Sequence, residues 1–373
     1  MSNDQGQKLQ IPELTHKNLE RIVERCFETK QALFEWGTFG IGKSYATKEI
    51  AKKIAKRLKL NYSEDKDDYN KEDTFVMRTI PIHQWDVSEL KGLPFPNKDH
   101  TKTTFLQTDE LPTSGQGIIF FDELPLAPPM VQANTYQIIQ DRQLGNYKVP
   151  PGYLIIAAGN FAEDRAHNFD MSMPLRNRFS HVALRIPTVE EWALEFALKN
   201  NISNSIINFL KWREEFLHSY DPDMEDDTLA VATPRTWEFA SKAIEGIDND
   251  LDFVRDLMGS NVGVPIAAEF TAWLELTKSY DIAQIFKTGK FDAPTAIDKI
   301  YAFITAAIAY YKKKSTQDNA VMALDIVTRF DPEHAIMFLS QLKYADDQFL
   351  NKIKKGNPKG WKASVEKYMK YLL

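Results

Sequence analysis

A glycine-rich stretch near the N-terminus contains a lysine and a serine at a spacing that serves phosphate binding. In LFEWGTFGIGKSYATKE, residues 33–49, the pattern G-x-x-x-x-G-K-S is formed by Gly37, Gly42, Lys43 and Ser44. Such glycines let backbone N–H groups surround an anion, and a helix that follows adds the positive end of its dipole. The lysine of this pattern reaches nucleotide β- and γ-phosphates, and the hydroxyl binds Mg²⁺. The stretch therefore predicts a phosphate loop whose contacts come from Gly37, Thr38, Phe39, Gly40, Ile41, Gly42, Lys43, Ser44 and Tyr45.

Two adjacent carboxylates follow the apolar run GIIFF, 79 residues after the lysine (122 − 43). Neither Asp122 nor Glu123 has a packing role, because an unpaired carboxylate is costly to bury. Phosphoryl transfer to water needs one carboxylate at Mg²⁺ and another that activates the nucleophile. We assign the metal role to Asp122, acting through a water molecule, and water activation to Glu123. The alternative is that the strand simply ends at the surface, with both carboxylates in solvent. The presence of Lys43 and Ser44 argues against it.

Another apolar run, YLIIAAGN, ends in an amide at Asn160. The carboxyl edge of a parallel sheet is where such sheets bind ligands, so Asn160 is a candidate to hold the attacking water or the γ-phosphate. Asparagine is also a common turn residue. At the end of a further run, His83 and Gln84 either tune Glu123 through a hydrogen bond or simply mark a strand exit.

Three arginines are candidates for contacts with a transferring phosphoryl group. Arg176 and Arg178 lie in MPLRNRFSHV, just before an expected strand, and arginine there stabilises charge on the phosphoryl group, in some proteins from a neighbouring subunit. Arg235 follows Pro234 in ATPRTW, at an expected helix start, where a cation is unfavourable unless an anion is near. Solvated surface positions are the alternative for all three.

The elements that must position these residues change character along the chain. From about residue 31 to 186, short β-rich apolar runs alternate with helical patterns, which is typical of a parallel sheet with crossover helices. A helix directly follows the loop, because apolar residues recur at helical spacing from Ile50 to Leu58. The charged run 61–73 is expected to be a solvated connector. Beyond Pro187 the pattern is helical. The runs expected as strands are ALFEWG, TFVMRTIPI, GIIFFDEL, YLIIAAGN and HVALRIP.

Composition limits the setting and the partners. The 373 residues carry a formal charge of −6, which argues against a general nucleic-acid binder, and the single cysteine fits a reducing, cytoplasmic location. The polar N-terminus is not expected to be an export signal. The apolar run Ile300–Tyr311 is much shorter than the roughly 20 residues needed to cross a membrane, so we expect a core helix there.

The order of the motifs gives a family resemblance. GTFGIGKS, GIIFFDEL, IIAAGN, PLRNRF and TPR resemble the Walker A, Walker B, sensor 1, arginine-finger and sensor 2 motifs of AAA+ ATPases. The chain is similar to the MoxR-like group within them. WDVSELKGLP, residues 85–94, resembles the segment that precedes an insert in that group, and residues 137–153 resemble its hairpin before sensor 1, with a tight turn at Gly145 and Asn146. The likeness covers roughly residues 12–245.

This resemblance implies a P-loop AAA+ core with a parallel sheet flanked by helices, then an all-α lid and a helical C-terminal extension. The implied domains are 1–188, 189–248 and 249–373, the last of unknown role. The implied ligands are ATP and Mg²⁺. Asn160 becomes the γ-phosphate sensor, Arg178 the first choice and Arg176 the second choice for a finger acting on a neighbouring subunit, and Arg235 the sensor of the lid. The group also implies a homo-oligomer, commonly a hexameric ring that remodels a protein client, with a von Willebrand factor A domain protein as a possible partner.

Two other functions stay open on sequence grounds. The first is an adaptor that assembles on nucleotide with little turnover, against which Glu123 argues. The second is a motor or GTP-using subunit acting on nucleic acid, against which the acidic balance argues. The sequence does not decide between ATP and GTP, because the base contacts cannot be located.

Overall fold

A seven-stranded parallel sheet forms the centre of the first of two units. The computed structural model describes residues 11–161, 164, 169–223, 229–247 and 250–357, and the chain divides into units of residues 1–186 and 187–373. The strand order is β1-β11-β2-β10-β7-β4-β3, and every neighbouring pair is parallel. The strands are β1 (Glu13–Leu14), β2 (Leu33–Trp36), β3 (Asn61–Ser63), β4 (Thr74–Pro81), β7 (Gln116–Asp122), β10 (Gly152–Gly159) and β11 (Ser180–Leu184).

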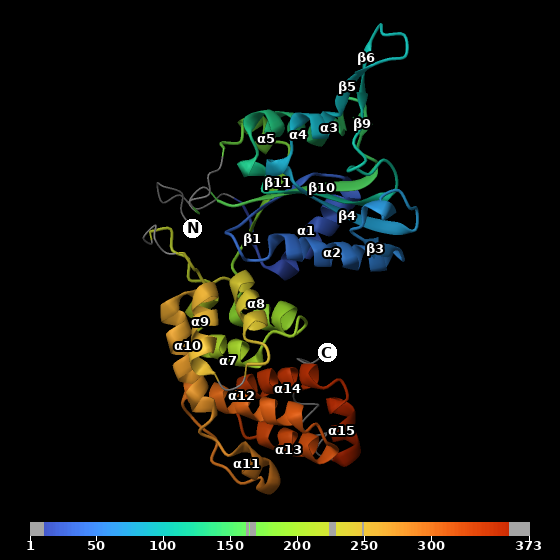
Figure 1. The fold of residues 1–373 in the computed structure, drawn as a ribbon. Helices are drawn as coiled ribbons and strands as arrows, with labels where there is room; N and C mark the ends of the chain where they lie inside the picture. The colour runs from blue at the N-terminus through green and yellow to red at the C-terminus, as the bar shows by residue number, and fades with distance from the viewer. Residues whose placement is uncertain (1–10, 162–163, 165–168, 224–228, 248–249, 358–373) are drawn as a thin grey trace. The chain divides into compact units, whose positions relative to one another are not determined.

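Helices cover both faces of this sheet (Figure 1). Helices α1 (His16–Thr29) and α2 (Lys43–Leu58) pack on one face, and α3 (Val87–Lys91), α4 (Pro129–Asp141) and α5 (Met173–Arg176) pack on the other. Alternate residues of a strand point to opposite faces, so Ile118 and Phe120 join the α1–α2 side while Ile119 and Phe121 join the α4 side. Both faces are buried, which explains why these strands are continuous apolar runs.

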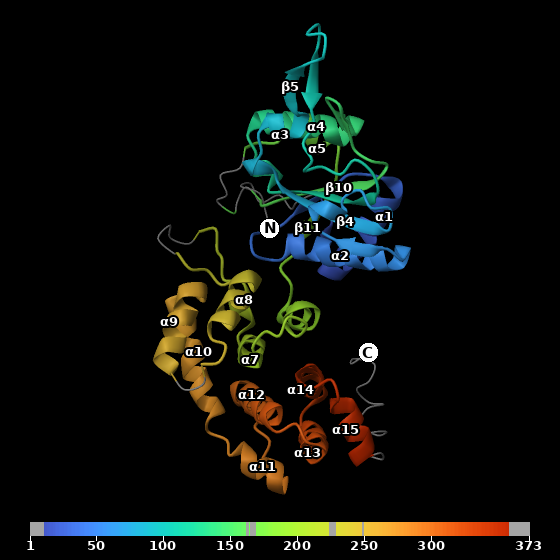
Figure 2. The same cartoon turned by 45° about the vertical axis from the view of Figure 1, so that its right-hand side comes forward.

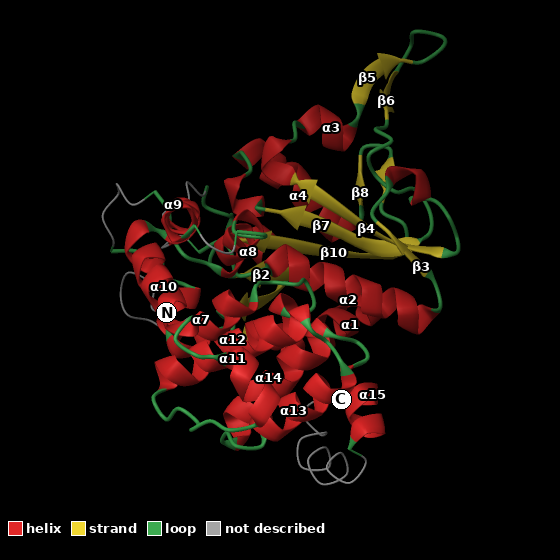
Figure 3. Cartoon of the chain, turned by 60° about the horizontal axis from the view of Figure 1, so that its bottom comes forward, coloured by secondary structure: helices red, strands yellow, loops and turns green. Residues whose placement is uncertain are grey.

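The central strands end at one edge of the sheet. In the register, Gly159 of β10 lies beside Trp36 of β2, and Pro81 of β4 lies beside Asp122 of β7. Figure 3 shows β4, β7 and β10 side by side, with α2 along one face. The loops that follow β2, β7 and β10 therefore leave from neighbouring positions. This common edge collects the polar residues that the sequence places after each apolar run.

Two small hairpins extend from the α4 side of the unit. Strands β5 (Leu93–Pro96) and β6 (Thr103–Leu106) form an antiparallel hairpin that projects beyond α3 (Figure 2). It follows α3 directly, as an insert after WDVSELKG would. Strands β8 (Gln143–Leu144) and β9 (Tyr147–Lys148) form the second hairpin, whose turn has Gly145 at φ 58°. The structure confirms the hairpin expected before Asn160.

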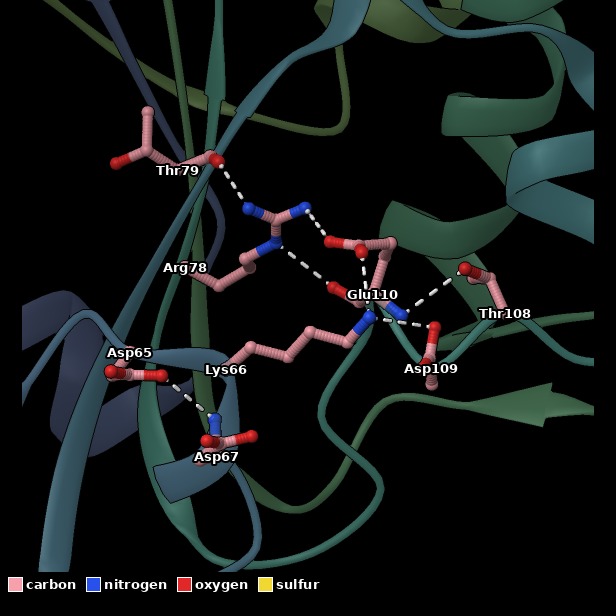
Figure 4. Close-up of polar contacts among 8 residues, drawn as sticks. All are labelled: Asp65, Lys66, Asp67, Arg78, Thr79, Thr108, Asp109 and Glu110. Carbon is pink, nitrogen blue, oxygen red and sulfur yellow. Dashed lines mark hydrogen bonds and ion pairs between the residues drawn. The ribbon is translucent and has the colours of Figure 1, made fainter.

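An ionic network fixes the segment that returns from the projecting hairpin to β7 (Figure 4). Arg78 of β4 donates from Nε to the Glu110 carbonyl at 2.9 Å and from a terminal nitrogen to the Glu110 carboxylate at 2.7 Å. Lys66, in the turn η1 (Lys66–Asp68), pairs with the same carboxylate at 2.7 Å and with Asp109 at 2.8 Å. The guanidinium also donates to the Thr79 carbonyl at 3.1 Å. Arg78 thus links a core strand to the base of the hairpin.

Replacing Arg78 with lysine is expected to destabilise the protein by about 1 kcal/mol, because lysine keeps the charge but loses the forked contacts to Glu110. Thermal unfolding followed by calorimetry measures the effect. The matched variant Lys66→Met removes ion pairs to the same Glu110 carboxylate and to Asp109, but from a more exposed side chain, so it should change stability less than Arg78→Lys does. Equal effects of the two variants would contradict the role assigned to the Arg78 fork.

The second unit is helical in its described part. Its helices share one apolar core that runs from Val189 to Ile353 and includes Trp237, Phe270 and Phe303. A π-helical turn, η5 (Ala193–Ala197), continues α6. The α-helices are α6 (Val189–Trp192), α7 (Asn204–Trp212), α8 (Pro234–Ala243), α9 (Leu251–Val262), α10 (Val264–Thr277), α11 (Ile282–Thr288), α12 (Ile297–Lys313), α13 (Gln317–Val327), α14 (Pro332–Ala345) and α15 (Phe349–Gly356).

The fold class predicted from the sequence is confirmed. A parallel sheet flanked by helices is followed by a helical part, as the predicted fold class requires. All five expected strands are present, and Ile300–Tyr311 lies within the buried helix α12. No helix among the described residues is long and apolar enough to cross a membrane. The predicted domain boundary at 248–249 falls on residues outside the described part and stays a prediction.

Candidate functional site

The glycine-rich stretch forms the loop between β2 and α2, as predicted. Gly40 and Gly42 have φ of 74° and 92°, left-handed values that glycine adopts without strain. Gly37 is needed for space instead, because a Cβ there would lie 3.0 Å from the Leu184 carbonyl oxygen. Thr38 is buried and its hydroxyl donates to Asp164 at 3.0 Å. The loop thus packs closely on β11 at Gly37, and a hydrogen bond ties it to the segment after β10 at Thr38.

Lys43 is the first residue of α2 and its ammonium lies inside the loop. It is buried, and it donates to the carbonyls of Gly37 at 2.7 Å and Thr38 at 3.0 Å. It also donates to Oδ1 of Asn160 at 2.7 Å. The N-terminus of a helix of 16 residues adds a positive dipole at the same place. These groups together form a site for an anion such as a phosphate.

Ser44 and Asp122 meet beside the loop. The Ser44 hydroxyl donates to the Asp122 carboxylate at 3.2 Å, which joins the start of α2 to the end of β7. Among the residues that the structure describes, no group of three or more His, Cys, Asp or Glu side chains can hold a metal. Mg²⁺ commonly binds one or two protein oxygens and completes its shell with water and substrate phosphates. A hydroxyl beside one carboxylate fits that pattern.

Asn160 connects Lys43 to Glu123. Its amide nitrogen lies 3.2 Å from each carboxylate oxygen of Glu123, while its oxygen accepts from Lys43. Burial raises the pKa of the Glu123 carboxyl and the Asp122 charge adds to the rise, whereas Lys43, Asn160 and His83 oppose it. A carboxylate with a raised pKa is a stronger base for water near neutral pH. Nε2 of His83 lies 3.3 Å from the Gln84 side chain. The side chain that donates a hydrogen bond to Glu123 is that of Asn160.

Glu123 is one of six non-glycine residues with a positive φ in the part of the chain that the structure describes. Its φ of 56° and ψ of 43° are left-handed, a region that a non-glycine residue occupies at a cost of about 1 kcal/mol or more. This conformation ends β7 at once and begins the turn η3 (Leu124–Leu126). Strained residues of this kind often occur at functional sites.

A buried carboxylate beneath the loop was missed by the sequence analysis. Glu35 lies in the middle of β2, is fully buried, and accepts hydrogen bonds from the Thr47 hydroxyl at 3.0 and 2.9 Å. Burial raises the pKa of Glu35 to about 8, although Thr47 and the Lys43 ammonium act to lower it. Its contact with Thr47 ties β2 to the first turns of α2. A glutamate inside an otherwise apolar run is the signal that identifies such a residue.

Replacing Glu35 with glutamine is expected to make stability less dependent on pH. The folded pKa is about 8 against about 4.5 for an unperturbed glutamate, so between these pH values only the unfolded chain is ionised at this position. The stability that the neutral carboxyl confers is fully present below about pH 4.5 and is lost as pH rises toward about 8. The glutamine variant should gain roughly 2–4 kcal/mol relative to the native protein between pH 5 and pH 8.

Urea unfolding of both proteins at pH 5 and pH 8 measures this difference. The variant Glu72→Gln, at an exposed position, provides the control because its carboxylate is solvated in both states. Parallel pH profiles for the native and Glu35→Gln proteins would show that Glu35 is ionised in the fold.

The two candidate finger arginines lie on the surface, in a turn that we call the arginine turn, residues 176–179. Arg178 donates from Nε to the Gln140 side chain at 2.8 Å and from a terminal nitrogen to the Tyr136 hydroxyl at 3.3 Å, with its guanidinium 5.6 Å from that ring centre. Both partners belong to α4. Arg176 is also exposed. The structure therefore fixes Arg178 against α4 at an exposed position.

Arg235 lies in the second unit. It is the second residue of α8, it is exposed, and Thr233 caps the helix before it. Its role at the nucleotide stays a prediction.

Comparisons with known proteins give weak likenesses. No family model matches the chain, and no curated protein matches it. Among solved structures, NtrX from Brucella abortus in complex with ADP is 16% identical over 94% of this chain and 64% of its own, with a TM-score of 0.35. Hsp104 with ATPγS and casein is 14% identical over 73% and 46%, with a TM-score of 0.34. A RuvB mutant from Thermotoga maritima is 14% identical over 91% and 86%, with a TM-score of 0.30. This chain spans about two thirds of the length of NtrX, and likenesses at this level carry no conclusion about activity.

Proposed function

We propose that this protein is a Mg²⁺-dependent ATPase of the AAA+ type, in which ATP hydrolysis drives the remodelling or activation of a protein partner. One observation carries the proposal. Lys43, Asn160 and Glu123 form a continuous line of hydrogen bonds at the carboxyl edge of the sheet, next to the contact between Ser44 and Asp122. A phosphate-binding cation, an amide and a candidate base are thereby held together. A module that only binds nucleotide has no need of the base.

Each side chain has a separate task in this scheme. The loop N–H groups and Lys43 would bind the phosphates, and Ser44 and Asp122 would hold Mg²⁺. The metal supplies charge neutralisation on the phosphate oxygens. Glu123 accepts a proton from the attacking water, and burial raises its pKa for this task. Asn160 orients both the carboxylate and the terminal phosphate. Positioning and electrostatics of this kind account for most of the catalysis of phosphoryl transfer.

The exposed arginine turn supports an oligomer. Arg178 is fixed against α4 on the surface, where it is accessible to the nucleotide of a second copy. We extend the proposal to a ring, with six subunits as the first expectation, and to the MoxR-like group. Arg235 would then report on the nucleotide from the helical unit as part of a lid formed by residues 189–248. A protein client, a von Willebrand factor A domain partner and a cytoplasmic setting belong to the same proposal.

Release of inorganic phosphate by the purified full chain tests the proposal. We expect turnover of ATP that depends on Mg²⁺, and loss of that turnover in Lys43→Met, which keeps the length of the side chain without its charge. Comparing the rates of phosphate release with GTP and with ATP establishes which nucleotide base the protein prefers. The proposal fails if the native chain binds ATP without releasing phosphate at any protein concentration that allows assembly.

A further inference from the structure

A polar chain connects the base of the phosphate loop to the arginine turn. Trp36 ends β2 and directly precedes Gly37, and His181 lies on the neighbouring strand β11. The indole N–H of Trp36 donates to Nδ1 of His181 at 3.0 Å. Because Nδ1 accepts, Nε2 carries the proton, and it donates to the Arg176 carbonyl at 2.7 Å. The neutral imidazole therefore joins the loop to the first residue of the arginine turn.

Aromatic packing joins the same segments. The Trp36 ring stacks on Phe34 with centroids 4.3 Å apart and on Phe161 at 6.0 Å, and Phe161 directly follows Asn160. Phe179, in the arginine turn, meets Phe34 edge-on at 5.3 Å. Apolar packing alone would hold these segments together. The two directed hydrogen bonds of His181 add a fixed orientation for the Arg176 peptide, two residues before Arg178.

From these contacts we propose that Trp36 and His181 are positioning residues that set the arginine turn and transmit to it a change at the phosphate loop. The effect on catalysis rests on the proposed function, in which Arg178 acts on the nucleotide of a neighbouring copy.

The source of the change is the carbonyl next to Trp36. Lys43 donates to the carbonyls of Gly37 and Thr38. A nucleotide phosphate that binds the ammonium competes with these bonds. The Gly37 carbonyl then loses part of its hydrogen bonding to Lys43, and the backbone at Gly37 shifts. Trp36 directly precedes Gly37 in the chain, and its indole N–H donates to His181. A tilt of the indole therefore alters the hydrogen bond that orients His181, and with it the Arg176 carbonyl.

A fluorine tag on the arginine turn detects this coupling without any need for turnover. Asn177 is exposed, and the only natural thiol, Cys26, is buried with its pKa raised by burial, so a trifluoromethyl reagent should label Asn177→Cys selectively. Adding Mg²⁺ with ADP or a non-hydrolysable ATP analogue should shift the tag's ¹⁹F resonance. In Trp36→Phe, which keeps a stacking ring and loses the N–H, the shift should disappear while calorimetry shows nucleotide affinity within about threefold.

Two outcomes overturn the inference and are distinguishable. If the native chain gives no binding heat with either nucleotide, the proposed function fails and the coupling fails with it. If nucleotide binds but the tag responds equally with and without the Trp36→Phe substitution, or responds in neither protein, the coupling alone is wrong. Trp212→Phe, in the second unit, is the matched tryptophan control and should leave the shift intact.

Turnover gives a second test. His181→Phe should lower kcat by roughly tenfold or more with KM within about threefold, because its own phosphate loop still binds nucleotide. Mixing it with Glu123→Gln protein should restore activity, since an intact arginine turn from one chain then faces an intact Glu123 on the other. A purely structural role would lower the activity of both chains in the mixture, and no recovery would be seen.

Discussion

Replacing Glu123 with glutamine is expected to lower the rate of ATP hydrolysis by about 10²–10⁴-fold, the usual contribution of a general base. Glutamine has the same shape and its amide oxygen still accepts from Asn160, so the line from Lys43 through Asn160 is preserved. Nucleotide binding should therefore persist. Phosphate release and binding calorimetry on the same preparation separate the two effects.

The matched replacement Glu72→Gln, at an exposed position away from the site, should leave turnover unchanged. Turnover of Glu123→Gln within twofold of the native rate would show that Glu123 is not the base of the reaction. Under the proposed function, the nucleotide-bound variant would also serve as a bait for a protein client, because a remodelling enzyme that cannot hydrolyse ATP should retain what it binds.

Replacing Arg178 with alanine is expected to lower turnover by about 10³-fold or more, the range found for arginines that stabilise a transferring phosphoryl group. The loss should appear in kcat, because Arg178 lies on the surface against α4, whereas nucleotide binding is assigned to Lys43 and the loop in the proposed function. Steady-state kinetics at several protein concentrations measures it. Arg176→Ala is the direct comparison, and a larger loss there would transfer the finger role to Arg176.

Mixing distinguishes action between subunits from action within one. Arg178→Ala and Glu123→Gln proteins are each expected to have little activity alone, yet an interface that combines Arg178 of one chain with Glu123 of the other should hydrolyse ATP. A mixture as inactive as its components would place Arg178 in the site of its own chain or outside catalysis altogether.

The parallel sheet could be predicted because its central strands are buried on both faces. Five apolar runs were sufficient to locate β2, β4, β7, β10 and β11. β3 was missed because it is a polar edge strand within the charged run 61–73, and it is defined by hydrogen bonds to β4 rather than by apolar burial. The helical unit was predictable in type, since residues such as Phe303 and Ile308 recur at helical spacing, while its packing depends on contacts between distant helices.

The site was predictable to the extent that its residues follow strands. Parallel strands end at one edge, so Lys43, Asp122 and Asn160 had to converge once the strand order placed β2, β10 and β7 together. The partners of Arg178 were not predictable, because Tyr136 and Gln140 come from α4, about 40 residues earlier in the chain. Likewise, nothing in the sequence pairs Trp36 with His181 before β2 and β11 are known to be neighbours.

The left-handed backbone of Glu123 bears on why a glutamate occupies this position. Glycine or asparagine fits φ 56° more comfortably than glutamate, so mutation under selection for stability alone would favour losing the carboxylate. Under the proposed function, glutamate at this position trades some stability for turnover, and Glu123→Gly should be more stable and inactive.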